Sequence, residues 1–178
     1  MISFNNIGNL GRLANQMFQY ASLKGIARKH GYDYSIPPLE VFGQHDPLVK
    51  QSSINIYNVF DIGENNTVTI AKNQILQERM HEFDKELFDN CPDNVDLYGY
   101  FQSPKYFDHI KDEIKSDFSF SKEVKAVCDE MFESIYQDEK VISVHLRRTD
   151  YTVNPNHPVQ SLEYYEKALS KFDKNDKI

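Results

Sequence analysis

The chain has 178 residues, of which 40% are hydrophobic and 13% aromatic, so it can bury a core and is not globally disordered. Its 27 acidic and 20 basic residues give a formal net charge of −7, which disfavours nucleic acid and anionic membrane surfaces as general partners. The two cysteines lack metal-ligand spacing and make no disulfide framework, which favours a reducing compartment.

The sequence shows neither a signal-peptide pattern nor an apolar stretch of membrane-spanning length. We therefore expect a cytoplasmic protein without a transmembrane segment. Peripheral association with the inner face of the membrane stays open.

The first residues follow the order strand, loop, helix, strand. Met1–Phe4 is a short apolar strand, and Asn5–Gly11 is a loop rich in asparagine and glycine. Apolar residues then recur on one face of a predicted helix that begins at Asn15, and Gly31 supplies its left-handed stop. Tyr32–Ile36 is the next predicted strand. This order is typical of the opening of a parallel α/β sheet.

Residues 39–94 show the least regular pattern, and no element boundary is predicted in them. Val95–Phe101 is a predicted strand, followed by a helix with Ser103 as its N-cap and Pro104 at its first position. Ser121 caps a second helix. Its apolar positions keep a helical period and comprise Val124, Val127, Cys128, Met131, Phe132 and Ile135. A cysteine on such a stripe is predicted to be a buried small hydrophobe.

A second sheet is predicted to begin near the end of the chain. Val141–Leu146 is mostly apolar, as a buried parallel strand is, and Ser161 caps a final helix. One face of that helix carries Leu162, Tyr165, Leu169 and Phe172. We therefore divide the chain into an α/β domain, residues 1–138, and the first strand and helix of an incomplete Rossmann-like domain, residues 139–178. The next element would be a strand starting at Ile178, so we expect the chain to stop within that domain.

Two adjacent arginines follow the predicted strand that ends at Leu146. Ligands of open α/β sheets bind beyond the carboxyl ends of the strands, which is where Arg147 and Arg148 lie. Arginine presents a fixed fork of donors that fits phosphate oxygens, and Asp150 can hold one guanidinium while the other meets the ligand. The equally weighted alternative is that both arginines are solvated or paired with the surplus acidic residues.

The loop Gly11–Gln16 is a second candidate anion site. Gly11 permits close backbone approach, and a helix N-terminus exposes unpaired N–H groups that favour anions. The alternative, favoured on residue type alone, is that Asn15 is only an N-cap. Neither a phosphate-loop motif nor the dinucleotide glycine pattern is present.

Two further groupings carry weaker signals. His81, Glu82 and Asp84 lack the helical spacing of a metal site, which favours a solvated charged turn. The stretch from Leu97 to Phe101 is similar to the aromatic patches that stack on sugars, although a core strand is the favoured interpretation.

Four stretches in register resemble the α-1,2-fucosyltransferase family. They are GRLANQMFQYA, YGYFQSPKYF, HLRRTDY and SLEYYEKAL, and together they span nearly the whole chain. The resemblance implies inverting transfer of L-fucose from GDP-fucose to a galactose-terminated glycan in α-1,2 linkage, with no cofactor and no obligatory metal. It also implies a GT-B architecture of two facing Rossmann-like domains. Members of the family are longer, so this chain alone is expected to be inactive.

The resemblance also assigns roles to residues. The HxRRxD pattern of the family falls on His145, Arg147, Arg148 and Asp150, all expected near the donor. Arg147 would contact the β-phosphate of GDP and act catalytically, while Arg148 and Asp150 would shape the loop. A base for the acceptor hydroxyl is not assigned.

In the amino-terminal loop, the resemblance makes Arg12 and Asn15 donor-binding residues, with Asn15 also a catalytic candidate. Ala14 and Thr149 each replace a glycine of the family pattern, which limits positive φ at both positions. Two alternatives from other classes stay open. One is a non-catalytic α/β domain that binds a glycan or a partner, and the other is a phosphate-binding enzyme of unrelated type.

Overall fold

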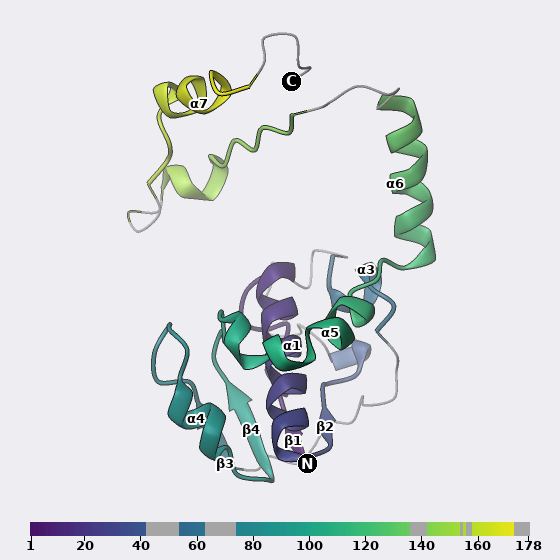
Figure 1. The fold of residues 1–178 in the computed structure, drawn as a ribbon, viewed down its shortest axis with the longest axis vertical. Coiled ribbons are helices and arrows are strands. Elements are labelled where there is room, and N and C mark those ends of the chain that lie inside the picture. Colours follow the sequence, from purple (N-terminus) through teal and green to yellow (C-terminus); the bar gives the residue numbers. More distant parts are fainter. Residues whose placement is uncertain (42–53, 63–73, 136–141, 154, 156–157, 173–178) are drawn as a thin grey trace. The chain divides into compact units, whose positions relative to one another are not determined.

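The computed structural model describes residues 1–41, 54–62, 74–135, 142–153, 155 and 158–172 (Figure 1). The chain divides into two compact units, Met1–Lys125 and Ala126–Ile178, which we call the first and the second unit. The division predicted between residues 138 and 139 stays a prediction.

The first unit contains a parallel sheet of four strands in the order β2-β1-β4-β3. The strands are β1 (Ile2–Ser3), β2 (Tyr34–Ser35), β3 (Gln74–Gln77) and β4 (Val95–Tyr98). Ser3 pairs with both Ser35 and Asp96, so β1 lies between β2 and β4. The predicted parallel α/β architecture is thereby confirmed. Strand β3, with three of its four residues exposed, falls in the region where no element was predicted.

Helix α1 (Leu13–His30) is the main helix of the first unit, and Figure 1 shows it lying against the sheet. It begins after Arg12 and ends at Gly31, whose φ of 69° is the predicted left-handed stop. Asn15 therefore lies in the first turn, and its interpretation as an N-cap is wrong. Even the polar residues Gln16 and Gln19 are buried in the core, because α1 is covered along much of its length.

Short helices complete the first unit. They are η1 (Leu39–Val41), α3 (Ile56–Val59), α4 (Lys85–Asn90), η3 (Pro104–Tyr106), η4 (Asp108–Ile110) and α5 (Lys111–Asp117). Pro104 begins η3 as predicted, although the Ser103 side chain makes no capping bond. Buried Lys24 of α1 reaches the Asp117 carboxylate at 2.5 Å, which fixes α5 to the domain.

The core lies between the sheet and the helices. It is rich in aromatic edge-to-face contacts: the rings of Phe4 and Phe101 are 5.6 Å apart, and those of Phe101 and Tyr106 are 5.2 Å apart. All three side chains are fully buried. The core therefore packs directly beneath the carboxyl end of β4.

Three helical segments lie at the end of the first unit and in the second: α6 (Lys122–Ile135), η5 (Thr149–Thr152) and α7 (Leu162–Leu169). Their predicted caps are confirmed, because Ser121 Oγ accepts from Val124 N at 3.4 Å and Ser161 Oγ from Tyr164 N at 3.3 Å. The apolar stripe of α6 is uncovered, however, and Cys128 is exposed. The prediction that Cys128 is buried is wrong.

The strand predicted at Val141–Leu146 is not formed. Residues 142–146 pair with no strand among those the structure describes, Leu146 is 55% exposed, and Val141 lies outside the described residues. A strand satisfies its backbone only through a neighbour, and none of the strands of the described sheet supplies one here. Within the described part of the chain, no helix has the length and apolar character needed to cross a membrane.

Candidate functional site

A cleft of about 390 Å³ opens where the strands of the first unit end. Its lining comes from the loop after β1 and from the last residues of β3 and β4 with those that follow them, and comprises Leu10, Gln77, Glu78, Arg79, Met80, His81, Tyr98, Gly99 and Tyr100. The carboxyl edge of a parallel sheet is the usual ligand position in open α/β folds. The cleft therefore lies where the topology predicts a binding site.

Glu78 joins the ends of β3 and β4. Its carboxylate accepts hydrogen bonds from the backbone N–H groups of Tyr100 at 3.1 Å and Phe101 at 2.8 Å, and from the Tyr106 hydroxyl at 3.2 Å. Burial raises the pKa of the Glu78 carboxyl, while these bonds lower it in part. The side chain thus fixes the turn that presents Tyr100 to the cleft.

Gln19 links the Leu10 side of the cleft to the segment after β4. Its buried Nε2 donates to the carbonyl of Leu10 at 3.2 Å and to that of Gly99 at 3.0 Å. A Cβ added at Gly99 would lie 2.7 Å from Cβ of Glu78, so this wall requires a glycine. Hydrogen bonds from the side chains of Glu78 and Gln19 to the backbone therefore fix the shape of the cleft.

Arg79, the arginine in the lining of the cleft, is already paired with carboxylates. Arg79 donates from Nε and Nη2 to the Asp84 carboxylate at 2.8 and 2.6 Å, and from Nη1 to Glu86 at 2.7 Å. The bond from Arg79 lowers the pKa of Asp84 to about 2. Asp84 is buried and caps α4 through Leu87 N, so the expectation of a wholly solvated charged turn is wrong for this residue.

His81 and Glu82, its neighbours in that turn, are exposed as expected. No group of acidic, histidine or cysteine side chains suited to a metal ion occurs among the described residues.

Part of the aromatic stretch at the end of β4 fits the interpretation as a core strand, and part fits the interpretation as an exposed aromatic patch. Val95 and Leu97 are buried in the core, whereas Tyr98 and Tyr100 are each 37% exposed and line the cleft. Alternation along the strand produces this division, because successive side chains point to opposite faces. The structure therefore joins a core strand and an exposed aromatic pair in one segment.

The loop that begins α1 is held close to the same segment. Gly11 has a φ of 81°, and a Cβ there would fall 2.0 Å from Asn15 Nδ2. Asn15 Oδ1 accepts from Gln102 Nε2 at 2.5 Å. Arg12 is exposed, and no partner for it occurs in the part of the chain that the structure describes. Two of the four quoted stretches, GRLANQMFQYA and YGYFQSPKYF, thus meet in space.

The HLRRTDY stretch lies in the second unit. The Arg147 guanidinium lies 4.8 Å from the centroid of the Tyr151 ring, while His145 and Arg148 are exposed. Arg148 immediately precedes η5, to which Asp150 belongs. The arginines therefore follow an unpaired segment rather than the strand end expected for them.

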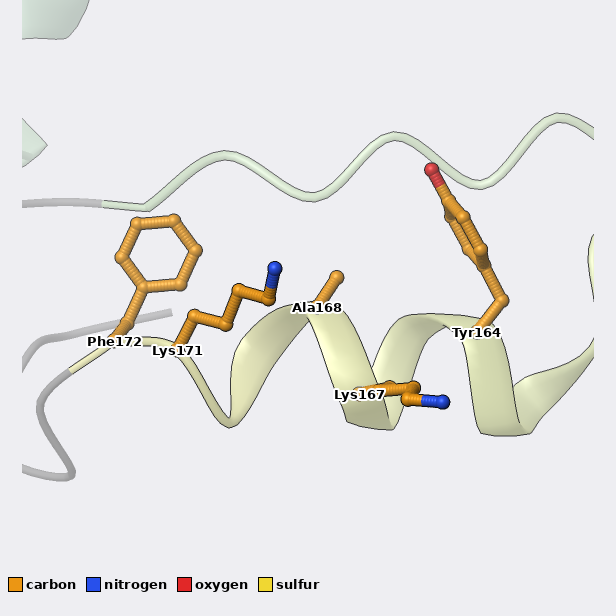
Figure 2. Close-up of a pocket in the computed structure, with 5 residues that line it drawn as sticks. All are labelled: Tyr164, Lys167, Ala168, Lys171 and Phe172. Carbon is orange, nitrogen blue, oxygen red and sulfur yellow. The ribbon is translucent and has the colours of Figure 1, made fainter.

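A hollow of about 470 Å³ lies along α7 in the second unit. Figure 2 shows Tyr164 and Phe172 at its two ends, with Ala168 and Lys171 between them. All five lining residues belong to α7 and the turn after it, so this is a groove along one helix face.

Sequence reasoning missed Glu78 and Arg79, which hold the cleft. Both lie in the irregular region where no strand was predicted, and their role depends on β3 lying beside β4. For Gln19 the sequence does contain a usable signal of burial, because Gln19 lies on the same side of α1 as Tyr20 and Leu23, which are buried. A polar residue at a core position calls for a buried partner.

Comparison with known proteins gives a consistent result. The model of glycosyl transferase family 11 matches residues 1–178. Galactoside alpha-(1,2)-fucosyltransferase 2 of Sus scrofa is 27% identical over 175 residues, which cover 93% of this chain and 48% of that protein. The O-antigen biosynthesis glycosyltransferase WbnK of Escherichia coli is 29% identical over 113 residues, 57% of this chain and 36% of that protein.

Galactoside alpha-(1,2)-fucosyltransferase 1 of Rattus norvegicus is 27% identical over 172 residues, 91% of this chain and 43% of that protein. The chain thus spans less than half the length of these relatives. No solved structure matches it.

Proposed function

The chain belongs to glycosyl transferase family 11, and we propose from this membership that it serves the transfer of L-fucose from GDP-fucose to a galactose-type hydroxyl in α-1,2 linkage. The observation that carries the proposal is the match to galactoside alpha-(1,2)-fucosyltransferases over 93% of the chain.

The proposed reaction inverts the configuration at C1 of fucose. The bond between C1 and the β-phosphate oxygen of GDP breaks, a bond from the acceptor oxygen forms on the opposite face, and the acceptor proton passes to a base. Negative charge grows on the β-phosphate while the sugar becomes oxocarbenium-like. A side chain placed to meet that charge binds the transition state more tightly than the ground state.

We assign that role to Arg147. Its guanidinium stays charged at any working pH and can bond two phosphate oxygens at once. The contact with the Tyr151 ring limits the rotamers of the Arg147 side chain, which supports a preplaced cation. His145, Arg148 and Asp150 shape the same loop in this proposal.

Arg12 and Asn15 are further donor-binding residues in the same proposal. Arg12 suits this role because it is exposed and has no partner among the residues that the structure describes. The bond from Gln102 to Asn15 Oδ1 holds the loop in place and leaves the Asn15 Nδ2 group to donate. No step of the proposed reaction requires a metal ion.

We further propose a GT-B arrangement in which residues from 139 onward begin the donor-binding domain. Residues 1–178 alone would then supply only a few exposed cationic contacts to GDP, each worth about 1 kcal/mol in water. Such contacts fall short of the freedom lost on binding. The proposal therefore includes that this length of chain does not turn over by itself.

The test is a transfer assay with labelled GDP-fucose and galactose-terminated acceptors in the presence of EDTA. It compares the 178-residue chain with any longer form that its gene encodes. In the form that turns over, we expect α-1,2-linked product, and Arg147→Ala should lower kcat about 10²–10³-fold. Arg147→Lys should recover only part of the rate, because lysine lacks the fork.

Arg28→Ala is the matched control, since Arg28 contacts Glu113 on the outer surface of α1. Wild-type turnover in Arg147→Ala would remove the phosphate role of Arg147. Transfer of a different sugar, or loss of activity in EDTA, would contradict the proposed reaction itself.

A further inference from the structure

The cleft at the carboxyl edge of the sheet has the size and the rigidity of a ligand site. Its volume of about 390 Å³ falls in the range of small-molecule pockets. Glu78 and Gln19 hold its walls through hydrogen bonds to the backbone of Tyr100 and Gly99. A site built in this way needs little reordering when a ligand enters.

The two tyrosines give the cleft an exposed aromatic surface. Tyr98 and Tyr100 are partly exposed although the residues next to them in the chain, Leu97 and Phe101, are fully buried. Neither hydroxyl has a hydrogen-bond partner among the described residues. A tyrosine ring offers a broad apolar face and a polar tip at a low cost in side-chain entropy. This combination fits a pyranose, which has an apolar C–H face and hydroxyls around its rim.

The charges around the cleft disfavour an anionic ligand. Each of the three guanidinium nitrogens of Arg79 donates to the carboxylate of Asp84 or Glu86, so the positive charge of Arg79 is already balanced by two carboxylates. Glu78 adds a carboxyl to the lining. His81 and Gln77 are exposed there and can bond to hydroxyl groups. The cleft therefore suits an uncharged, hydroxyl-rich ligand and disfavours GDP.

From this geometry we infer that the cleft binds the terminal neutral sugar of the acceptor, with Tyr98 and Tyr100 as the stacking surface. The inference rests on the proposed function for the identity of that sugar as a galactose. The charges therefore separate the two substrates: the acceptor sugar occupies the cleft, and the diphosphate of the donor is bound by arginines outside the cleft. Glu78 and Gln19 are positioning residues for the two rings.

The experiment measures binding without any donor, so it does not depend on turnover. The 178-residue chain is titrated with lactose, with lactose sulfated on its galactose, and with GDP, and affinities are taken from ligand-observed NMR. We expect lactose to bind more tightly than either anion. Tyr98→Ala should weaken lactose binding about tenfold, and Tyr98→Phe should bind almost as wild type because it keeps the ring.

Tyr164→Ala is the matched control, because Tyr164 is an exposed tyrosine on α7 outside the cleft. It should leave lactose affinity unchanged. If circular dichroism shows that Tyr98→Ala unfolds the domain, Tyr100→Ala takes its place, since Tyr100 lies beyond the end of β4. Equal loss of affinity in Tyr164→Ala, no saturable lactose binding, or tighter binding of the sulfated sugar would each overturn the inference.

The two proposals fail in different ways. Lactose binding that depends on Tyr98, in a protein that never transfers fucose, would refute the proposed function and leave the cleft as a neutral-glycan site. The opposite result is fucose transfer by the Tyr98→Ala, Tyr100→Ala double variant with an unchanged KM for the acceptor. It would refute the inference that the cleft binds the acceptor sugar and leave the proposed function intact.

Discussion

The two units of this chain differ in what covers their apolar residues. In the first unit, Leu97 and Phe101 are fully buried beneath the sheet edge that forms the cleft. In the second unit, Leu162 and Phe132 are 65% and 59% exposed although each lies in a regular helix. Regular helices thus occur in both units, whereas a buried core with an organised polar edge occurs in the first.

This difference shows which secondary structures a segment can form without contacts to other segments of the chain. A helix satisfies its own backbone hydrogen bonds, and one serine cap is enough to start α7. A strand requires a neighbour, which is why β4 forms beside β1 and β3 while Ile142–Leu146 forms no strand. Local signals therefore predicted helices in both units but a strand correctly only where partners exist.

The largest effect should come from a matched pair of leucines. Leu97→Ala removes a fully buried side chain and should lower the free energy of unfolding by about 2–5 kcal/mol. Leu162→Ala, on exposed α7, should change it by less than about 0.5 kcal/mol. Urea denaturation of both variants measures the contrast. Equal losses would show that α7 is packed as tightly as β4 and would break the comparison.

A second pair separates steric fit from backbone strain in the first unit. Gly11→Ala forces a Cβ onto the Asn15 side chain at a φ of 81° and should cost about 2–3 kcal/mol. Gly31→Ala has a similar φ of 69° with nothing within 4 Å, so it should cost only about 1 kcal/mol. The same denaturation experiment compares them. An equal cost would mean that the Gly11–Asn15 contact is not formed in solution.

A third prediction concerns acid stability. The pKa of Asp84 is about 2 in the folded protein against a usual value of 3.8, so the folded state binds the proton less readily than the unfolded chain. The pair with Arg79 therefore stabilises the fold above about pH 4, and this contribution is lost as the pH falls toward 2. Because Arg79 is half exposed, solvent screening keeps this contribution small.

The measurement is the free energy of unfolding as a function of pH for wild type, Asp84→Asn and Arg79→Gln. Both variants should flatten the slope between pH 4 and pH 2. An unchanged slope in both would show that Asp84 is not paired with Arg79 in solution.

The smallest effect should come from the caps. Ser161→Ala removes the bond to Tyr164 N and should reduce helicity in α7, at a cost of about 1 kcal/mol. Ser161→Asp, which can still accept that bond, should restore it. Helical chemical shifts of Leu162–Leu169 report the change. Full helicity in Ser161→Ala would show that packing, not the cap, maintains this helix. The contrast in packing between the two units would then be smaller than the structure indicates.

Much of the fold was predictable because its signals are local. The glycine stop of α1, the serine caps of α6 and α7, and the strands at both ends of the first β-α-β segment all depend on neighbouring residues in the chain. Strand β3 was not predictable, since its residues are mostly exposed and its pairing with β4 depends on the tertiary fold. Burial of Cys128 was wrongly predicted because periodicity shows which face is apolar and not what covers it.

The candidate site was predictable only in part. The sequence indicates the loop at Gly11 as a candidate anion site and, as the less favoured interpretation, the stretch Leu97–Phe101 as a sugar-stacking patch. Their proximity, through Asn15 and Gln102, required the fold. Glu78 gave no signal, because a carboxylate that binds backbone N–H groups of a distant segment has the same sequence appearance as a solvated one.

The central claim is that the first unit carries an organised site for a neutral sugar. Residue-resolved amide NMR of the 178-residue chain during a lactose titration tests it most directly. The account predicts saturable shifts at Leu10, Arg79–His81 and Tyr98–Tyr100, with the amides of the second unit unchanged. Shifts that are largest in the second unit, or a first unit that does not respond at all, would contradict it.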